Sequence, residues 1–132
     1  MRENEITRVI VDAAYHIHSR LGPGLLETVY EVLLAHSLQK RGLQVARQVP
    51  VPIVFDGVRF EEGFRADLIV DSLVIVELKS VEALLPVHAK QVLTYLRLTG
   101  LHVGLLLNFG AVRLKDGIER LVNGLSEEPP TL

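Results

Sequence analysis

Three charged residues interrupt two strongly apolar segments in the middle of the chain, within the stretch RADLIVDSLVIVELKS that begins at Arg65. Asp67 lies in the first segment, and Glu77 and Lys79 lie in the second. An ionised carboxylate in apolar surroundings costs a large free energy unless it is ion-paired or binds a metal. These three residues are therefore the first candidates for chemistry.

The spacing of these residues predicts that they meet in the folded chain. Both segments have the composition of β-strands, and Asp71-Ser72 between them has the residue types of a turn. Residues two apart on a strand share a face, so Glu77 and Lys79 project in the same direction. If the two strands pair through this turn, Asp67 lies roughly across from Glu77.

Two carboxylates in such a position have two interpretations. Like charges repel, and a divalent cation between them removes the conflict. Carboxylate, carbonyl and water oxygens suit Mg²⁺ or Mn²⁺, which lowers the pKa of a bound water and offsets charge on a phosphate. Lys79 could then orient that water or stabilise the developing charge. Alternatively, Asp67 and Glu77 form ion pairs with Arg65 and Lys79 at the end of a sheet, and the pattern by itself leaves both interpretations open.

The elements that must position these residues follow from hydrophobic periodicity and from turn residues. Apolar residues at helical spacing predict two N-terminal helices, the first capped at Asn4, with a Gly-Pro-Gly break between them. Three strands, a third helix, another strand and a hairpin follow, with turns at Asp56-Gly57 and Asp116-Gly117. The predicted elements span residues 6–21, 25–41, 49–55, 58–70, 73–79, 86–99, 102–110 and 112–122.

This order of elements predicts the fold class. Pro50 and Pro52 cannot donate ladder hydrogen bonds, so the first strand should lie at a sheet edge. The helix between the third and fourth strands is a crossover that places these two strands parallel. We expect an α/β (α+β) fold with a central mixed sheet flanked by helices, in the order α-α-β-β-β-α-β-β. Residues 1–125 should form a single domain, and residues 126–132 a flexible C-terminal tail.

Composition narrows the functional classes. The 132 residues suit one domain, and 48% apolar with 23% charged residues is an ordinary globular balance. A net charge of −2 argues against a basic, tail-type nucleic-acid binder. The lack of cysteine excludes a disulfide framework and a cysteine-type zinc site. No apolar run approaches the ~20 residues of a membrane span, and the first residues lack the order of a signal peptide, so we expect a cytoplasmic location.

Asp67 followed by Glu77-Leu78-Lys79, on adjacent strands before a crossover helix, resembles the core of the PD-(D/E)XK nuclease superfamily. The resemblance implies a restriction-endonuclease-like core and a metal-dependent nuclease. It implies metal ligands at Asp67 and Glu77, with the Leu78 backbone carbonyl as a third, and a catalytic role for Lys79. Ala66 stands where the superfamily has its nominal proline, a position that shapes the backbone and supplies no ligand.

Two further motifs sharpen this resemblance. Gln91 and Tyr95 stand four residues apart on one face of the third helix, which is similar to the Gln-x-x-x-Tyr helix of the RecB-like branch. The segment from Gly24 to Tyr30 is similar to the Gly-x-x-Glu-x-x-Tyr motif of a group of small bacterial proteins. The resemblance implies that Gln91 and Tyr95 line the site and that Glu27 is an additional acidic residue reaching the same centre.

Several other residues have predicted positions. Arg65, Lys90 and Arg97 are the candidate phosphate contacts because they lie near the site residues in the sequence. Tyr30 should lie in the core or form a hydrogen bond to the glutamate of its motif. Glu31, one turn after that glutamate, should lie on a solvated face.

The main functional hypothesis is therefore a nuclease that uses Mg²⁺ or Mn²⁺ to hydrolyse phosphodiester bonds, with DNA expected more than RNA. One alternative is a nucleic-acid-binding or assembly module of the same fold that has weak catalysis or none. Another is a structural domain with an ion-paired hairpin. A homodimer fits the first hypothesis, because one site cuts one strand and cleavage of a duplex needs two.

Overall fold

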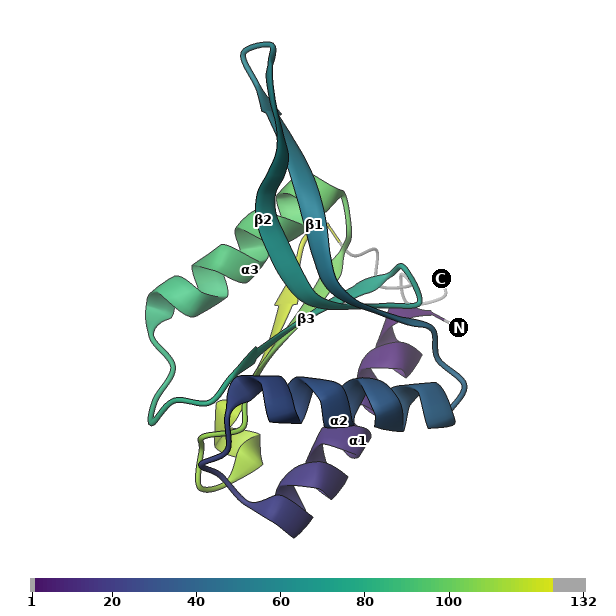
Figure 1. Ribbon diagram of the computed structural model, residues 1–132, viewed down its shortest axis with the longest axis vertical. Helices are drawn as coiled ribbons and strands as arrows, with labels where there is room; N and C mark the ends of the chain where they lie inside the picture. The colour runs from purple at the N-terminus through teal and green to yellow at the C-terminus, as the bar shows by residue number, and fades with distance from the viewer. Residues whose placement is uncertain (1, 125–132) are drawn as a thin grey trace, which may run out of the picture.

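A five-stranded mixed β-sheet forms the centre of the molecule in the computed structural model, which describes residues 2–124 (Figure 1). The helices are α1 (Glu3–Leu21), α2 (Glu27–Lys40) and α3 (Pro86–Thr99), and the strands are β1 (Val45–Phe55), β2 (Val58–Val70), β3 (Val74–Lys79), β4 (Val103–Asn108) and β5 (Ile118–Val122). A short 3₁₀ helix, η1 (Leu114–Gly117), precedes β5. The α+β class and the order of helices and strands agree with the prediction from sequence.

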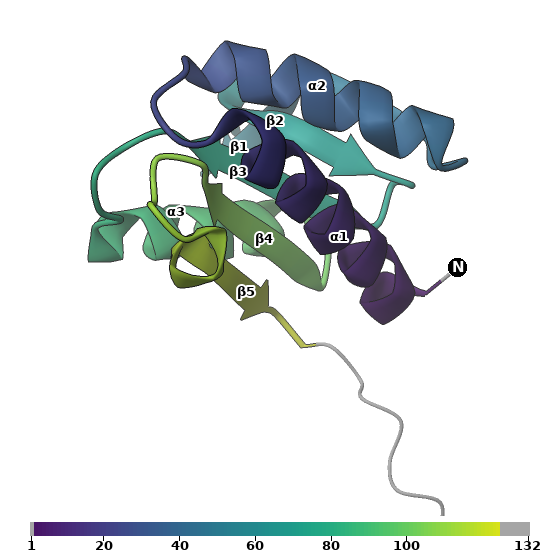
Figure 2. The ribbon, with the colours of Figure 1, turned by 90° about the horizontal axis from the view of Figure 1, so that it is seen from below.

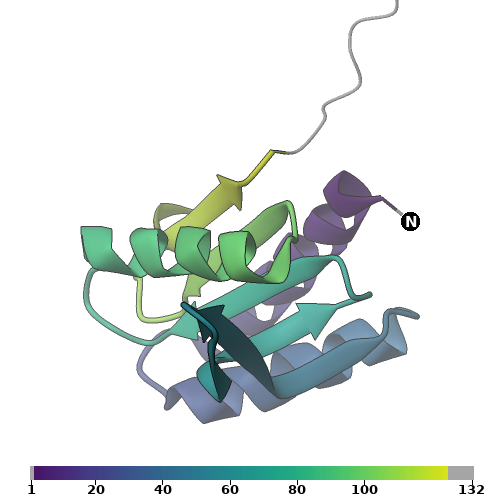
Figure 3. The ribbon, with the colours of Figure 1, turned by 90° about the horizontal axis from the view of Figure 1, so that it is seen from above.

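The sheet lies between two helical layers. Helices α1 and α2 cover one face together, as the view from below shows (Figure 2). Helix α3 covers the opposite face, as the view from above shows (Figure 3). Within residues 2–124, no helix combines the length and the apolar character that crossing a membrane requires.

The strands lie in the order β1-β2-β3-β4-β5, and their directions follow from their connections. Tight turns join β1 to β2 and β2 to β3, so these pairs are antiparallel. Helix α3 connects β3 to β4, and these two strands are parallel, as the crossover prediction requires. Strand β1 lies at the sheet edge, which agrees with the prediction from its two prolines.

Two apolar clusters, one on each face, hold the layers together. The larger cluster joins α1 and α2 to the sheet, and Leu68, Val76 and Leu78 belong to it. The smaller cluster lies under α3, and its members include Ala66 and Ile75. Since residues along β3 alternate between the two clusters, Glu77 and Lys79 follow Ile75 on the face that α3 covers.

Two tight turns set the register of β1, β2 and β3. Asp71 and Ser72 both have positive φ, 51° and 58°, at the centre of a turn that the Leu73 N–H closes onto the Val70 carbonyl oxygen at 3.0 Å. Leu73 follows as an additional residue before the paired Val74. Asp56 and Gly57 form a turn of the same kind, with φ values of 51° and 75°. The Asp71 carboxylate also accepts a hydrogen bond from the backbone N–H of Gln44, at 2.8 Å, which ties the β2–β3 turn to the start of β1.

Two predictions about local structure are wrong. Helix α1 begins at Glu3, so Asn4 lies inside the helix and not at its cap. The first arm of the predicted hairpin at residues 112–122 is no strand, because the chain forms η1 there instead. The short helical turn buries Leu114 and brings Gly117 close to the end of β4, where a Cβ atom would lie 2.7 Å from the Asn108 carbonyl oxygen. The predicted C-terminal tail, residues 126–132, lies outside the described residues.

Strands β1 and β2 extend beyond the rest of the sheet as a two-stranded arm (Figure 1). The pairing of Phe55 with Val58 and of Ile53 with Phe60 places these four apolar side chains on one face of the arm. Phe55 is 79% exposed and Phe60 is 56% exposed. The arm therefore presents an apolar face to solvent, which is unusual for an isolated two-stranded ribbon.

Candidate active site

Asp67 and Glu77 lie at the point where the backbones of β2 and β3 separate. The last paired residues are Leu68 and Val76, and Asp67 and Glu77 are the next positions on each strand. Their side chains continue the hydrogen bonding: the Asp67 N–H donates to Glu77 Oε1 at 3.2 Å, and the Leu78 N–H donates to Asp67 Oδ2 at 2.9 Å. The two carboxylates therefore bridge the strands, in the juxtaposition that the spacing predicts.

The Glu77 carboxyl is buried, at 8% exposure, beside a second acid. Burial and the charge of Asp67 raise the pKa of Glu77 to about 9, and the positive charge of Lys79 opposes this shift. Among residues 2–124, neither Asp67 nor Glu77 takes part in an ion pair. Arg65 pairs with Glu62 at 2.6 Å, so the alternative of an ion-paired hairpin is not the arrangement that forms.

The oxygen donors of this pair suit a hard divalent cation, not a soft one. In the described part of the chain, no three His, Cys, Asp or Glu side chains gather as a ready metal centre. A cation at Asp67 and Glu77 would therefore take its remaining ligands from backbone carbonyl oxygen, solvent or a bound phosphate. Two adjacent carboxylates, one of them buried and neither of them ion-paired, fit such a cation because it would offset the repulsion between them, which the charge of Lys79 offsets only in part.

Tyr95 on α3 lies close enough to Asp67 and Glu77 for their charges to act on its hydroxyl. Burial raises the pKa of its hydroxyl, and the charges of Glu77 and Asp67 add to that rise. Its ring stacks on Phe64 of β2, with centroids 3.9 Å apart and planes 3° from parallel. Gln91 lies one turn earlier on α3 and is exposed. The stack on β2 therefore places Tyr95 next to the acidic pair.

The Gly-x-x-Glu-x-x-Tyr segment runs from the connection between α1 and α2 into the start of α2. The Tyr30 hydroxyl donates to the Gly22 carbonyl oxygen at 2.6 Å and accepts from the Leu25 N–H at 3.2 Å. The Tyr30 ring is fully buried and stacks on Phe109, with centroids 4.5 Å apart. The prediction of a core position is right, but the hydroxyl binds the backbone of the connection and not Glu27.

Glu27 is exposed at the first position of α2. It lines a cleft of about 440 Å³ together with the residues just before it and with Ser80, Val81, Glu82 and Gly110. Ser80 directly follows Lys79, and its hydroxyl donates to the Leu25 carbonyl oxygen at 2.6 Å. The cleft therefore lies between the start of α2 and the residues that follow β3.

The prediction that Glu31 lies on a solvated face is wrong, because Glu31 is buried, at 4% exposure. Arg47 of β1 donates to Glu31 Oε2 from Nε at 3.2 Å and from Nη2 at 2.9 Å. The Gln48 amide donates to Glu31 Oε1 at 2.6 Å and also to Asp67 Oδ1 at 3.4 Å. Neither Arg47 nor Gln48 is among the residues predicted for the site. The contacts of Glu31 have a single signal in the sequence. Glu31 follows Glu27 by four residues, which puts both glutamates on one face of α2.

The three candidate phosphate contacts lie at the surface. Arg65 is on β2 and is already paired with Glu62, whereas Lys90 and Arg97 are exposed on α3. Lys90 and Arg97 are seven residues apart, so they share one side of the helix. Their contact with phosphate stays a prediction.

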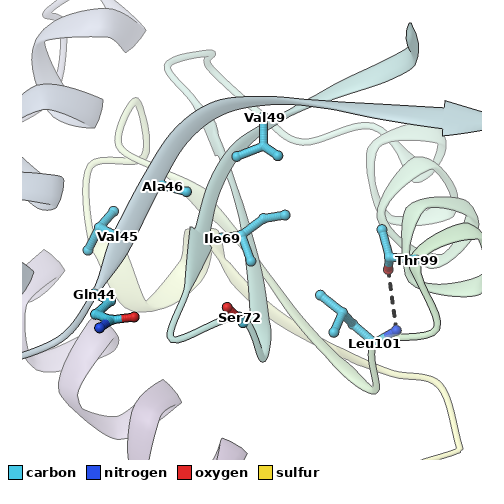
Figure 4. A pocket seen from close by; sticks show the side chains of 8 residues that line it. All are labelled: Gln44, Val45, Ala46, Val49, Ile69, Ser72, Thr99 and Leu101. Atoms are coloured by element: carbon cyan, nitrogen blue, oxygen red, sulfur yellow. Dashed lines mark hydrogen bonds between the residues drawn. The ribbon is translucent and has the colours of Figure 1, made fainter. Parts of the chain in front are cut away.

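A second pocket, of about 470 Å³, lies between the start of β1 and the end of α3. Figure 4 shows the apolar side chains of Val49, Ile69 and Leu101 around it, with Thr99 bonded to the Leu101 N–H at 3.3 Å. None of the predicted site residues lines this pocket. It is therefore separate from the acidic pair.

A protein-family model described as the PD-(D/E)XK nuclease superfamily matches residues 4–121. The match spans the chain from α1 into β5 and includes Asp67, Glu77 and Lys79 together with Tyr95. A comparison with curated proteins found no match, and neither did a comparison with solved structures.

Proposed function

Because the chain belongs to the PD-(D/E)XK nuclease superfamily, we propose that it is a metal-dependent nuclease that hydrolyses phosphodiester bonds, with DNA as the substrate more than RNA. One observation carries this proposal: a buried carboxylate and a second carboxylate bridge two separating strands, and neither forms an ion pair among residues 2–124. Such a pair is costly unless a cation neutralises it.

In this proposal, Asp67, Glu77 and the backbone carbonyl of Leu78 hold Mg²⁺ or Mn²⁺. A bound divalent cation supplies positive charge that lowers the pKa of a coordinated water and offsets the charge of the phosphate. The Leu78 N–H holds one oxygen of Asp67 at 2.9 Å, which keeps this carboxylate beside β3. A fixed carboxylate loses less conformational entropy when a cation binds to it.

The other residues of the chain act on the substrate and on the attacking water. Lys79 shares a face with Glu77, and its ammonium group orients the water and stabilises the charge that develops on the phosphate. Tyr95 and Gln91 line the site from α3, and Glu27 reaches the same centre across the cleft at the end of β3. Arg65, Lys90 and Arg97 contact phosphates of the bound strand.

The proposal includes a homodimer, because two sites are needed to cut both strands of a duplex. The exposed apolar face of the arm supports a second copy of this chain as the partner. Each arginine of the arm already pairs with a glutamate, Arg59 with Glu61 and Arg65 with Glu62, so the arm has no surplus of positive charge for phosphate. The cytoplasmic location stays a prediction.

Cleavage assays test the proposed function. Purified protein is incubated with single- and double-stranded DNA and RNA, with Mg²⁺, Mn²⁺ or EDTA. We expect metal-dependent cleavage that falls by at least about a hundredfold in Asp67→Asn and in Lys79→Ala. Glu5→Gln and Lys40→Ala change exposed residues of α1 and α2 and serve as matched controls with unchanged activity.

The outcomes separate the proposal from its alternatives. Cleavage that persists in Asp67→Asn would come from another site or from a contaminant. Tight binding of nucleic acid without cleavage under any metal condition would favour the binding module of the same fold.

A further inference from the structure

We infer that Gln48 is a positioning residue for Asp67, and that Glu31 anchors Gln48 for this task. The inference rests on the proposed metal site, and it concerns residues that the nuclease motifs do not contain. Gln48 lies on β1, beside Asp67 of β2, whereas Glu31 lies on α2. Together they connect the helical layer to the acidic pair through side chains.

The contacts of Asp67 show how its carboxylate is held. Its Oδ2 atom accepts from the Leu78 N–H at 2.9 Å, and its Oδ1 atom accepts from Gln48 Nε2 at 3.4 Å. These donors come from β3 and β1, the two strands that flank β2. A carboxylate held at each oxygen from opposite sides has little rotational freedom, so its orientation is set before a cation arrives.

Glu31 determines where the Gln48 amide points. The Gln48 NH₂ group has two hydrogens, and one goes to Glu31 Oε1 at 2.6 Å while the other goes to Asp67. Arg47 occupies the other oxygen of Glu31, Oε2, through two N–H groups. Glu31 is thereby neutralised and fixed, although it is only 4% exposed. An oxygen of a buried, immobile carboxylate is a rigid anchor for the amide.

The backbone conformation of Gln48 is a second feature that supports its positioning role. Its φ is +50° within β1, a region that residues other than glycine rarely adopt. The pairing is unbroken on both sides, with Arg47 opposite Leu68 and Val49 opposite Ala66, so Gln48 directly faces Asp67. Glycine would adopt this backbone at a lower cost. The backbone alone therefore does not account for a glutamine here, whereas a side chain that must reach Asp67 does.

The same position is where β1 and β2 change the face on which they pack. Val45 packs in the cluster under α1 and α2, and Val49, four residues later, packs in the cluster under α3. On β2, Ile69 and Ala66 both pack under α3 although they are an odd number of residues apart. The strands therefore twist sharply at Gln48 and Asp67. This twist turns the Asp67 side chain toward β3, and the Gln48 contact holds it there.

The Gln48→Gly variant tests whether Gln48 positions Asp67 for metal binding or only stabilises the fold. Glycine relieves the positive φ, whereas loss of the amide leaves Glu31 Oε1 without this partner, so we expect these opposing effects to leave only a small change in the urea midpoint of unfolding in EDTA. Loss of the amide should weaken Mg²⁺ and Mn²⁺ binding, measured by titration calorimetry, by about 10- to 100-fold. A merely structural role would move the two measurements in the same direction.

Two further variants keep the test decisive if glycine loosens the strand. Gln48→Asn tolerates positive φ and keeps the amide, but its side chain is one carbon shorter and cannot span Glu31 and Asp67. We expect it to fold as the wild type does and to lose metal affinity. Gln44→Asn makes the same exchange at an exposed position near the start of β1 and should change neither measurement.

The metal affinities of the wild type and of the Gln48 variants show whether the positioning role holds, and whether the proposed metal site holds. Wild-type affinity in both Gln48 variants overturns the inference and leaves the proposed nuclease intact. Affinity that falls only in proportion to stability also overturns it, because Gln48 would then be a structural residue. Absence of Mg²⁺ and Mn²⁺ binding by the wild type overturns the metal site and this inference together.

Discussion

Glu77 governs, at the scale of single residues, how the metal-free protein responds to pH. Burial and the Asp67 charge raise its pKa from 4.5 to about 9. The folded state then holds the Glu77 proton more tightly than the unfolded state does. The stability contributed by this proton is fully present below about pH 4.5 and is lost as pH rises toward 9.

We predict that the metal-free protein becomes less stable between pH 5 and pH 9. The free energy of unfolding, measured by urea denaturation in EDTA, should fall by at most about 1.4 kcal/mol per pH unit, the limit for one proton. Glu77→Gln carries no titrating carboxyl and should lose most of this slope. A wild-type profile as flat as that of the variant would mean that Glu77 is already ionised at neutral pH.

At the scale of elements, the connection between α1 and α2 depends on Tyr30. This connection contains both glycines of the Gly-Pro-Gly break, and it carries Leu25, whose carbonyl oxygen accepts from the hydroxyl of Ser80, just after β3. The Tyr30 hydroxyl holds both ends of the connection through Gly22 and Leu25. The tyrosine of the motif therefore holds the wall of the cleft that Glu27 lines, and it does so from the core.

Tyr30→Phe should destabilise the protein by about 1–2 kcal/mol, because it leaves a carbonyl oxygen and an N–H without their partner. The phenylalanine ring keeps the stack on Phe109, so the core itself should remain packed. Urea denaturation measures the change, and Tyr15→Phe, at a position that is 40% exposed, is the matched control. Equal midpoints for the two variants would contradict this role of the hydroxyl.

At the scale of the whole molecule, the arm is the feature that packing within the described chain does not explain. Its apolar face includes Phe55, Val58 and Phe60, which are 79%, 55% and 56% exposed. Pro50 and Pro52 make β1 a poor edge for adding another strand, so a partner would meet the face of the arm. A phenylalanine buries ~150–250 Å², and a standard interface buries ~800 Å² per partner. We therefore expect a weak dimer.

The proposed dimer should depend on concentration and on this face of the arm. Sedimentation equilibrium at protein concentrations from about 1 to 100 μM should show association of the wild type, as expected for a small apolar interface. Phe55→Ser with Phe60→Ser should abolish it without a change in the unfolding midpoint, because both side chains are exposed. Val54→Ser, on the opposite face and 61% exposed, should still associate. A wild type that is monomeric throughout would reject the dimer.

Much of the site follows from sequence because its geometry is local. Asp67 and Glu77 are joined by a short turn, and the three residues between the paired Val70 and Val74 set the register that places Asp67 across from Glu77. The period of two along a strand then places Lys79 beside Glu77. The crossover helix brings Tyr95 over the same face for a reason that is also general, the handedness of strand–helix–strand units.

The rest was decided by tertiary structure. Glu31 carries no local signal of burial, and it is buried because α2 lies across β1, where Arg47 neutralises it. Nor does the sequence around Gln48 predict a positive φ, which arises where the two strands twist between the clusters on the two faces. Hydrophobic pattern and turn chemistry act over a few residues, which is why the acidic pair could be predicted without the fold. The packing of a helix on a distant strand depends on the whole chain, so only the fold decided what holds that pair in place.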